Sequence, residues 1–169
     1  LAARILAIKG LTTPRPYPVL VPSLAPALEA CAQRARAALA VLARLVWPGA
    51  LTLIVPLCED AERQLAPVAP SGTVGFRMPA HPAPRYLAAR AGGYLIGTSA
   101  NPAGAPPPAT SDALDPGLLA AADGWIAAAP PCAGVASTVL DLSGELPTVL
   151  RIGAVDPAPL LARLEEIRP

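Results

Sequence analysis

Three short apolar runs near the end of the chain follow one another too closely for a helix to fit between them. They cover residues 125–128, 137–142 and 148–152. Strands joined by short connections can pair side by side, whereas a parallel pair needs a crossover of a dozen or more residues. The spacing therefore favours a sheet that is mixed or partly antiparallel.

Residues with helical periodicity fill much of the remaining chain. Apolar side chains recur every three or four residues in 1–9 and in 28–46, which is predicted to be one helix with room for a break, and a last helix begins at Asp156. Further strands are predicted at 17–21, 51–57, 73–77 and 94–98, and a further helix at 84–91. We therefore expect one α/β domain over residues 1–169, built on a twisted mixed sheet flanked by helices.

The charge of the chain is nearly balanced, which limits the partners that it can attract. Its 169 residues include 13 basic and 12 acidic side chains, for a net charge of +1 at pH 7. No strong global field draws such a protein to nucleic acid or to a membrane surface, so a site for a polyanion must be a local cluster. Aromatic residues make up 4% of the chain, which argues against a sheet that stacks RNA bases.

Cysteine and histidine are too scarce for a disulfide framework or a histidine-rich metal centre. Cys31, Cys58 and Cys132 are widely spaced and odd in number, which fits small buried side chains in a reducing cytoplasm. His81, the single histidine, stands between two prolines and is expected to shape a turn. The longest uncharged stretch, residues 91–111, contains glycines and prolines that a membrane helix would not carry together. The sequence thus predicts no protein-bound metal, no membrane contact and a cytoplasmic location.

Polar side chains gather in four clusters at the ends of predicted strands. The clusters are Lys9 with Arg15, Thr73 with Arg77, residues 98–101 with Thr110, and Ser137 and Thr138 with Arg151. Arginine forks match carboxylate or phosphate oxygens, and hydroxyls and turn amides can complete a cradle for an anion. The clusters contain no nucleophile–base pair, and each also fits solvated arginines and turn-capping hydroxyls. An anionic ligand and a purely structural role therefore both remain open.

Five segments, taken in order, resemble the YrdC/TsaC family. They read WPGALTL at 47–53, VGFRMPAHP at 74–82, GTSANPAG at 97–104, STVLD at 137–141 and LRIG at 150–153. The resemblance implies that family's fold, a twisted α/β sheet around a large concave, positively lined groove. It also implies a threonylcarbamoyl-AMP synthase, which is a nucleotidyltransferase that converts L-threonine, bicarbonate and ATP into threonylcarbamoyl-adenylate and pyrophosphate.

The resemblance also assigns partners to the chain. The product would pass to a tRNA threonylcarbamoyltransferase complex for the threonylcarbamoyladenosine modification of tRNA, and tRNA or double-stranded RNA would be a binding partner. Mg²⁺ would arrive with ATP and bridge phosphate oxygens, largely through water, with no site of its own on the protein.

Residue roles follow from the matched positions in the family motifs. L-threonine would contact Arg77, Ser99 and Ser137, with Arg77 on its carboxylate. ATP would contact a larger set made of Lys9, Arg15, Thr73, Asn101, Thr110 and Arg151. Lys9 matches the first residue of the family's Lys-x-Arg motif, and Lys9, Arg77 and Ser99 are the expected catalytic groups.

Two departures from the family pattern touch the expected site. The family's N-terminal Pro-Thr-x-Thr-x-Tyr-Gly segment, which helps to bind threonine, is absent, so the chain is expected to be N-terminally incomplete relative to the family. Leu11 stands where the Lys-x-Arg motif has its arginine, and loss of such a charge-assisted contact costs about 1.5–3 kcal/mol. Arg15 is the nearest residue that could compensate.

The departures keep other functions open. One is a catalytically weak relative that binds RNA or nucleotide, for which Arg34, Arg36 and Arg44 on one predicted helix are the candidate contacts. A solvated helix face would explain the same three arginines. Another alternative, ranked lower, is a domain that forms carbamoyl-adenylate, as in hydrogenase-maturation carbamoyltransferases.

Overall fold

The computed structural model describes most of the chain in two compact units. The described residues are 2–10, 12, 16–126 and 134–167. The smaller unit comprises residues 1–15 and 98–136, and the larger unit comprises residues 16–97 and 137–169. Whether the units form one domain stays a prediction, as does the concave groove.

The larger unit contains a six-stranded sheet in the order β4-β1-β3-β2-β5-β6. The strands are β1 (Val19–Leu20), β2 (Leu51–Pro56), β3 (Thr73–Arg77), β4 (Leu95–Ile96), β5 (Thr138–Asp141) and β6 (Thr148–Arg151). The pairs β1–β3 and β2–β5 are parallel, whereas β1–β4, β2–β3 and β5–β6 are antiparallel. The predicted mixed sheet is therefore confirmed, and the closely spaced β5 and β6 are antiparallel as their short connection requires.

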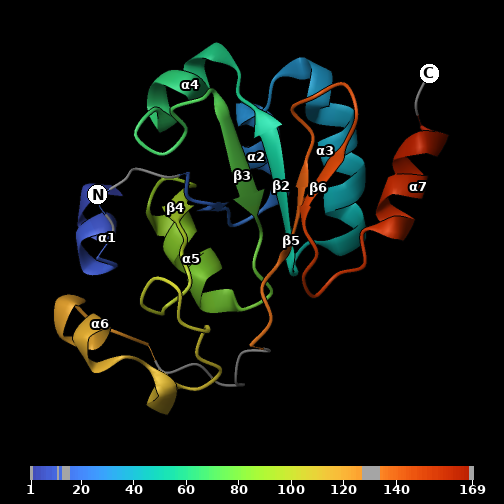
Figure 1. The fold of residues 1–169 in the computed structure, drawn as a ribbon. Coiled ribbons are helices and arrows are strands. Elements are labelled where there is room, and N and C mark those ends of the chain that lie inside the picture. The colour runs from blue at the N-terminus through green and yellow to red at the C-terminus, as the bar shows by residue number, and fades with distance from the viewer. Residues whose placement is uncertain (1, 11, 13–15, 127–133, 168–169) are drawn as a thin grey trace. The chain divides into compact units, whose positions relative to one another are not determined.

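Five helices in the described part of the chain belong to the larger unit. They are α2 (Leu24–Ala30), α3 (Gln33–Val46), α4 (Glu59–Leu65), α5 (Pro82–Arg90) and α7 (Ala158–Glu166). Of these, α3 contacts β2, and α5 contacts β1 and β4. In Figure 1, α2 and α3 lie behind the strands, and α7 packs against α3. The expected helix over 28–46 is indeed broken once, between α2 and α3, where the N–H of Ala32 donates to the carbonyl oxygen of Pro56 at 2.8 Å.

One row of apolar side chains crosses the sheet and forms the centre of the core. Val19, Phe76, Leu53 and Leu140 are successive partners across β1, β3, β2 and β5, and each is at most 1% exposed. Val149 on β6 continues the row. Successive residues along a strand point to opposite faces, so the neighbours of these residues face away from this core.

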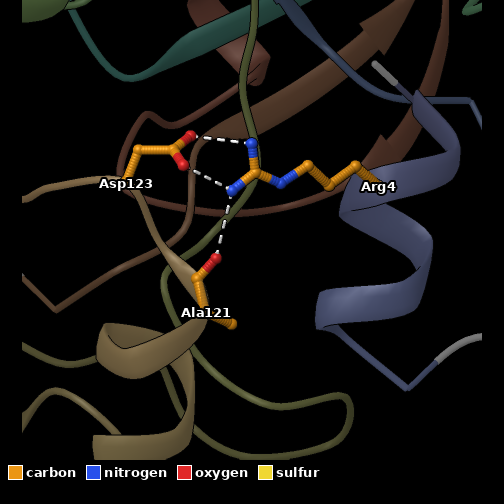
Figure 2. A network of polar contacts seen from close by, with 3 residues as sticks. All are labelled: Arg4, Ala121 and Asp123. Atoms are coloured by element: carbon orange, nitrogen blue, oxygen red, sulfur yellow. Dashed lines mark hydrogen bonds and ion pairs between the residues drawn. The ribbon is translucent and has the colours of Figure 1, made fainter.

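The smaller unit holds α1 (Ala2–Ile8), the 3₁₀ helix η1 (Ser111–Ala113) and α6 (Pro116–Ala121). Figure 2 shows how α1 is tied to the segment after α6: Arg4 donates from Nη1 and Nη2 to the two carboxylate oxygens of Asp123, at 2.7 and 2.8 Å. Nη2 also donates to the carbonyl oxygen of Ala121 at 3.3 Å. This pairing raises the pKa of Arg4 and lowers that of Asp123, because the hydrogen bonds and opposite charges favour both ionised forms.

The structure differs from the sequence-based expectation in three places. The short helices α4 and α6 were not predicted, because α4 buries only Ala61 and Leu65 and α6 buries no residue, so neither shows a clear apolar stripe. The strand predicted at 125–128 is wrong for Trp125 and Ile126, which are exposed and outside any strand, and its other two residues lie outside the described part of the chain. No helix in the described ranges has the length and hydropathy needed to span a bilayer.

Candidate ligand-binding site

The larger unit presents its predicted site residues on the sheet face opposite the core row. Thr73 and Arg77 lie four residues apart on β3 and share this face, as predicted. Thr52 on β2 pairs with Val139 on β5, which in turn pairs with Arg151 on β6. The β5–β6 pairing shifts register between Val139 and Leu140, so Arg151 does not share the face of Val149, and its hydrogen bonds to Ser137 place its guanidinium on the site face. A threonine hydroxyl and two guanidinium groups are thus carried on one face.

Ser137 lies at the centre of the polar contacts on this face. Its Oγ is 2.9 Å from Thr52 Oγ1 and accepts a hydrogen bond from Arg151 Nη2 at 3.1 Å. Arg151 Nε also donates to the Ser137 carbonyl oxygen at 3.0 Å. Ser137 and Thr52 are 5% and 4% exposed, so both hydroxyls are held in fixed positions by their partners. The guanidinium and the two hydroxyls form one connected group that can meet an anion.

Thr138 fixes the end of β6 behind this group. The Thr138 hydroxyl is completely buried, donates to the carbonyl oxygen of Val155, and accepts from the N–H groups of Gly153 and Val155 at 2.9 and 3.1 Å. All of its hydrogen-bonding capacity is used within the protein. Thr138 is therefore a structural residue that holds the turn after Arg151, and the neighbouring Ser137 is the residue of the pair that remains for a ligand.

Arg77 is oriented by the loop that precedes β2. Its Nε donates to the carbonyl oxygen of Gly49 at 3.0 Å, and the Gly49 N–H donates to the Met78 carbonyl oxygen at 2.9 Å. A Cβ at position 49 would lie 2.3 Å from the carbonyl oxygen of Val46, so only glycine fits there without a backbone shift. The peptide bond between Trp47 and Pro48 is cis. The loop thus sets the direction of the Arg77 guanidinium.

Thr73 lies at the other end of β3 and has a less constrained environment. Its Oγ1 is 3.0 Å from the hydroxyl of Ser71, in an exposed pair. A residue four positions from Arg77 on an extended strand is about 13 Å away along the chain. The distance between Thr73 and Arg77 on this face is therefore long enough for a ligand of several groups.

Lys9 in the smaller unit is directed onto the segment 98–101. Its ammonium group donates to the Ser99 carbonyl oxygen at 2.8 Å and to Thr98 Oγ1 at 3.2 Å, and the residue is only 6% exposed. A buried charge needs such partners to offset its loss of hydration. Lys9 thereby fixes the backbone that presents the exposed side chain of Ser99.

Asn101 is buried in the same segment with an acceptor oxygen left over. Its Nδ2 donates to the carbonyl oxygens of Pro102 and Ala105, which identifies the nitrogen and the oxygen of the amide. Its Oδ1 is buried and has no hydrogen-bond partner among the described residues. Thr110 is exposed and begins η1 without a side-chain cap. An unpaired buried acceptor is costly, so Asn101 is the residue of this segment best suited to receive a donor from a ligand.

Eight of the nine predicted site residues are described, and they divide into two groups of four. Lys9, Ser99, Asn101 and Thr110 belong to the smaller unit, and Thr73, Arg77, Ser137 and Arg151 belong to the larger unit. Arg15 and Leu11 lie outside the described residues. The structure joins Ser137 to Arg151 in the larger unit and Lys9 to the backbone of Ser99 in the smaller unit. Arg77 and Thr73 instead contact Gly49 and Ser71.

Two contributors were missed by reasoning from the sequence. Thr52 contacts Ser137, and Gly49 orients Arg77. Both lie within the WPGALTL segment, where a single threonine interrupts an apolar strand. The period of two along a strand puts Thr52 on the face away from Leu51 and Leu53, and that polar position inside a buried strand was the available signal.

Other candidate residues have structural partners. Arg34 donates to the carbonyl oxygen of Ser143 at 2.6 Å, and Arg36 donates to that of Cys31 at 2.9 Å, so two of the three arginines considered for RNA binding are engaged with the backbone. His81 begins α5, and its Nδ1 accepts from the N–H of Ala83 at 3.1 Å. These intramolecular hydrogen bonds give Arg34, Arg36 and His81 structural roles that need no ligand.

The described residues offer no protein-based metal centre. No group of three or more His, Cys, Asp or Glu side chains among them is placed to hold an ion. One surface hollow of about 270 Å³ lies on the larger unit, lined by Pro22, Pro82, Arg85 and Tyr86. It contains none of the predicted site residues, so the candidate residues of the larger unit lie on the sheet face instead.

A scan against protein families gives one matching model. The Sua5/YciO/YrdC model, described as telomere recombination, matches residues 1–153. The chain belongs to the Sua5/YciO/YrdC family. The resemblance seen in the five motifs is thereby confirmed, and the family match covers residues of both units.

Curated members of the Sua5/YciO/YrdC family include threonylcarbamoyl-AMP synthases. The Bacillus subtilis threonylcarbamoyl-AMP synthase is 37% identical over 116 residues, which are 68% of this chain and 33% of that protein. A putative threonylcarbamoyl-AMP synthase of Mycobacterium tuberculosis H37Rv is 36% identical over 114 residues, or 68% of this chain and 51% of that protein. The chain therefore matches about a third to a half of the length of these relatives.

Solved structures of the family share the fold. Pyrococcus abyssi Sua5 complexed with L-threonine superposes with a TM-score of 0.80 at 28% identity, covering 98% of this chain and 48% of that chain. Escherichia coli YciO gives a TM-score of 0.67 at 20% identity over 94% of this chain and 76% of that chain, a likeness of fold alone. The predicted α/β fold class is confirmed.

Proposed function

We propose that this chain is a threonylcarbamoyl-AMP synthase. The amine of L-threonine would take up bicarbonate with loss of water to give a carbamate. A carbamate oxygen would then attack the α-phosphorus of ATP, and the bond to the β,γ-pyrophosphate would break. The products are threonylcarbamoyl-adenylate and pyrophosphate, with Mg²⁺ entering as the Mg²⁺–ATP substrate.

The observation that carries the proposal is the contact between Ser137 and Arg151 on the sheet face that also bears Arg77. A guanidinium held by two hydrogen bonds beside a buried hydroxyl is suited to bind an anion in a defined orientation. The family relatives named threonylcarbamoyl-AMP synthase and the threonine-bound Sua5 structure support threonine and a nucleotide as the ligands.

In this proposal the residues of each unit have separate tasks. Arg77 and Ser137 bind threonine, with Arg77 on the carboxylate, and Thr73 and Arg151 bind ATP. In the smaller unit, Ser99 serves the threonine and carbamate end, whereas Lys9, Asn101 and Thr110 serve ATP, together with Arg15. Lys9, Arg77 and Ser99 act on the reacting groups. Catalysis of this kind depends on positioning and on neutralising phosphate charge, so a site without a nucleophile–base pair is adequate.

Partners of the reaction follow from its product. Threonylcarbamoyl-adenylate is a reactive mixed anhydride, so a cytoplasmic enzyme complex that transfers the threonylcarbamoyl group to tRNA would consume it. The alternative of a nucleotide- or RNA-binding relative with little activity has less support, because Arg34 and Arg36 already serve backbone carbonyls.

The test is pyrophosphate release from Mg²⁺–ATP and bicarbonate, with and without L-threonine and with L-serine as the control substrate. We expect release that depends on threonine and is abolished in Arg77→Ala. Arg44→Ala is the matched control, because Arg44 is exposed on α3 and should leave turnover unchanged. Near-normal turnover in Arg77→Ala contradicts the site assignment. Absence of threonine-dependent release in the unaltered chain, with nucleotide or RNA binding retained, would favour the binding protein.

A further inference from the structure

The hydroxyl of Ser137 has three hydrogen-bonding positions, one donor and two acceptors. A guanidinium can only donate, so Arg151 Nη2 occupies one acceptor position of Ser137 at 3.1 Å. Thr52 Oγ1 lies at 2.9 Å, and either oxygen of that pair can be the donor. The direction of the Thr52–Ser137 hydrogen bond therefore decides what Ser137 can offer to a ligand.

The Thr52 hydroxyl has no second hydrogen-bond partner among the described residues. It is 4% exposed, and Ser137 is its single hydrogen-bond partner among the described residues. When Ser137 donates to Thr52, the Thr52 proton is left without an acceptor in a buried position, which is unfavourable. When Thr52 donates to Ser137, both acceptor positions of Ser137 are filled and its own proton is left for a ligand.

The direction of the Thr52–Ser137 hydrogen bond determines whether a ligand acceptor or a ligand donor is favoured at Ser137. An acceptor oxygen on the ligand receives the Ser137 proton, Thr52 turns to donate to Ser137, and every hydroxyl is satisfied. A donor group such as an ammonium would have to use a lone pair of Ser137, which leaves the Thr52 proton unpaired. Donation from Arg151 polarises Ser137 and strengthens its own donation to an anion.

We propose that Thr52 is a positioning residue that makes Ser137 a hydrogen-bond donor to an acceptor oxygen of the ligand. The inference rests on the proposed function, because it takes that ligand to be L-threonine, whose carboxylate offers acceptors only. It adds a specificity device to the site: the Thr52–Ser137–Arg151 group selects a carboxylate or carbonyl oxygen over an ammonium group.

The packing around Thr52 separates its methyl group from its hydroxyl and so supplies the variants. A Cβ added at Gly75 would lie 3.0 Å from Thr52 Cγ2, so the methyl group packs over Gly75 while the hydroxyl faces Ser137. Thr52→Val keeps the branched shape and removes the hydroxyl. Thr52→Ser keeps the hydroxyl, and Thr52→Ala serves as the second hydroxyl-free variant if Thr52→Val does not fold by circular dichroism.

The experiment measures dissociation constants for L-threonine and for L-threoninol, which lacks the carboxylate, by isothermal titration calorimetry. We expect Thr52→Val to weaken L-threonine by about 5- to 20-fold and L-threoninol by less than about twofold, with Thr52→Ser within about twofold of the unaltered protein. The double variant Thr52→Val/Ser137→Ala should be no weaker than Ser137→Ala alone, because Thr52 acts through Ser137.

Three results would overturn the inference: unchanged L-threonine affinity in Thr52→Val, equal losses for both ligands, or a double variant in which the two losses add. If the protein binds L-threonine but releases no pyrophosphate, the proposed function is contradicted, and the affinities of the Thr52 variants still test this inference. If the unaltered protein binds no L-threonine, the proposed function fails, and acetate becomes the carboxylate probe, followed by nuclear magnetic resonance. If the acetate affinity measured by nuclear magnetic resonance is the same in the unaltered protein and in Thr52→Val, the inference is overturned as well.

Discussion

The side chain of Arg77 is held by the carbonyl oxygen of Gly49, to which its Nε donates at 3.0 Å. The two residues are 28 positions apart in the chain. The guanidinium is a rigid plane, so one fixed N–H sets the direction in which its other groups point. The backbone of the 47–50 loop thereby becomes part of the candidate site without offering a side chain to it.

Replacing Gly49 tests this arrangement. In Gly49→Ala the new Cβ would meet the Val46 carbonyl oxygen at 2.3 Å, and the backbone must move. We expect a loss of about 1–3 kcal/mol in the free energy of unfolding, the usual cost of overpacking, and L-threonine binding weakened about tenfold or more. Urea unfolding and calorimetry measure the two effects. Gly144→Ala, whose nearest neighbour would lie at an ordinary 3.6 Å, is the control. A Gly49→Ala protein with normal threonine affinity would show that the loop does not orient Arg77.

Asn101 offers a second test, directed at the nucleotide. Asn101→Ala removes the buried Oδ1 that has no partner in the described residues, together with the donors to Pro102 and Ala105. We expect the affinity for Mg²⁺–ATP to fall about tenfold or more, as is typical for loss of a buried hydrogen-bonding group, while L-threonine binding changes little. Titration with each ligand alone separates the effects. Equal weakening of both ligands would indicate a general loss of structure in this segment.

His81 is expected to contribute to stability through its position at the start of α5. Its Nδ1 accepts from the Ala83 N–H, so His81→Ala should lower the free energy of unfolding by about 0.5–2 kcal/mol, as for other N-cap residues. His81→Ser should retain most of the stability, because its hydroxyl can accept the same hydrogen bond. Thermal unfolding at constant pH compares the three proteins. Loss of turnover in His81→Ser with full stability would instead point to a catalytic imidazole.

Burial raises the pKa of the Cys31 thiol from 9.0 to about 11. The folded state therefore keeps this proton when the unfolded state has lost it. The contribution of the protonated Cys31 thiol to the free energy of unfolding is therefore complete below pH 9 and is lost as the pH rises toward about 11. Cys31 should also react with iodoacetamide more slowly than the half-buried Cys58 at neutral pH, because the thiolate is the nucleophile. Peptide mass spectrometry after timed alkylation measures both rates, and faster modification of Cys31 in the folded protein would contradict its burial.

Strand pairing was predictable where chain length left few choices. β5 and β6 are joined by too short a segment to be anything but antiparallel neighbours, and the alternation along β3 correctly placed Thr73 and Arg77 on one face. The helices α4 and α6 escaped prediction because each has at most two turns. α6 begins at a local cap, where Asp115 accepts from the Leu118 N–H, whereas α4 begins without a side-chain cap.

The contacts between the candidate site residues were harder to predict from the sequence than the identities of those residues. Family motifs named Ser137 and Arg151, but no local pattern shows that Thr52, 85 residues before Ser137, completes their group. That contact exists because β2 and β5 are parallel partners, which is a property of the sheet order and not of either segment. Similarly, the backbone partners of Arg34 and Arg36 come from chain folding, and their spacing along α3 resembles a ligand-binding stripe until those partners are seen.

The parallel pairing of β2 with β5 has a consequence for biosynthesis. β2 leaves the ribosome long before β5 does, and until then one edge of its apolar strand has no partner. Long-range pairs of this kind form slowly, and an unpaired strand edge is prone to associate with other chains. A nascent chain that ends before residue 137 would lack Leu140 against Leu53 and could not form the Thr52–Ser137 contact. Association through the unpaired edge of β2 is therefore expected to be greatest before residues 137–141 are synthesised, and ligand-binding competence should appear abruptly once residues 137–151 have emerged rather than build up along the chain.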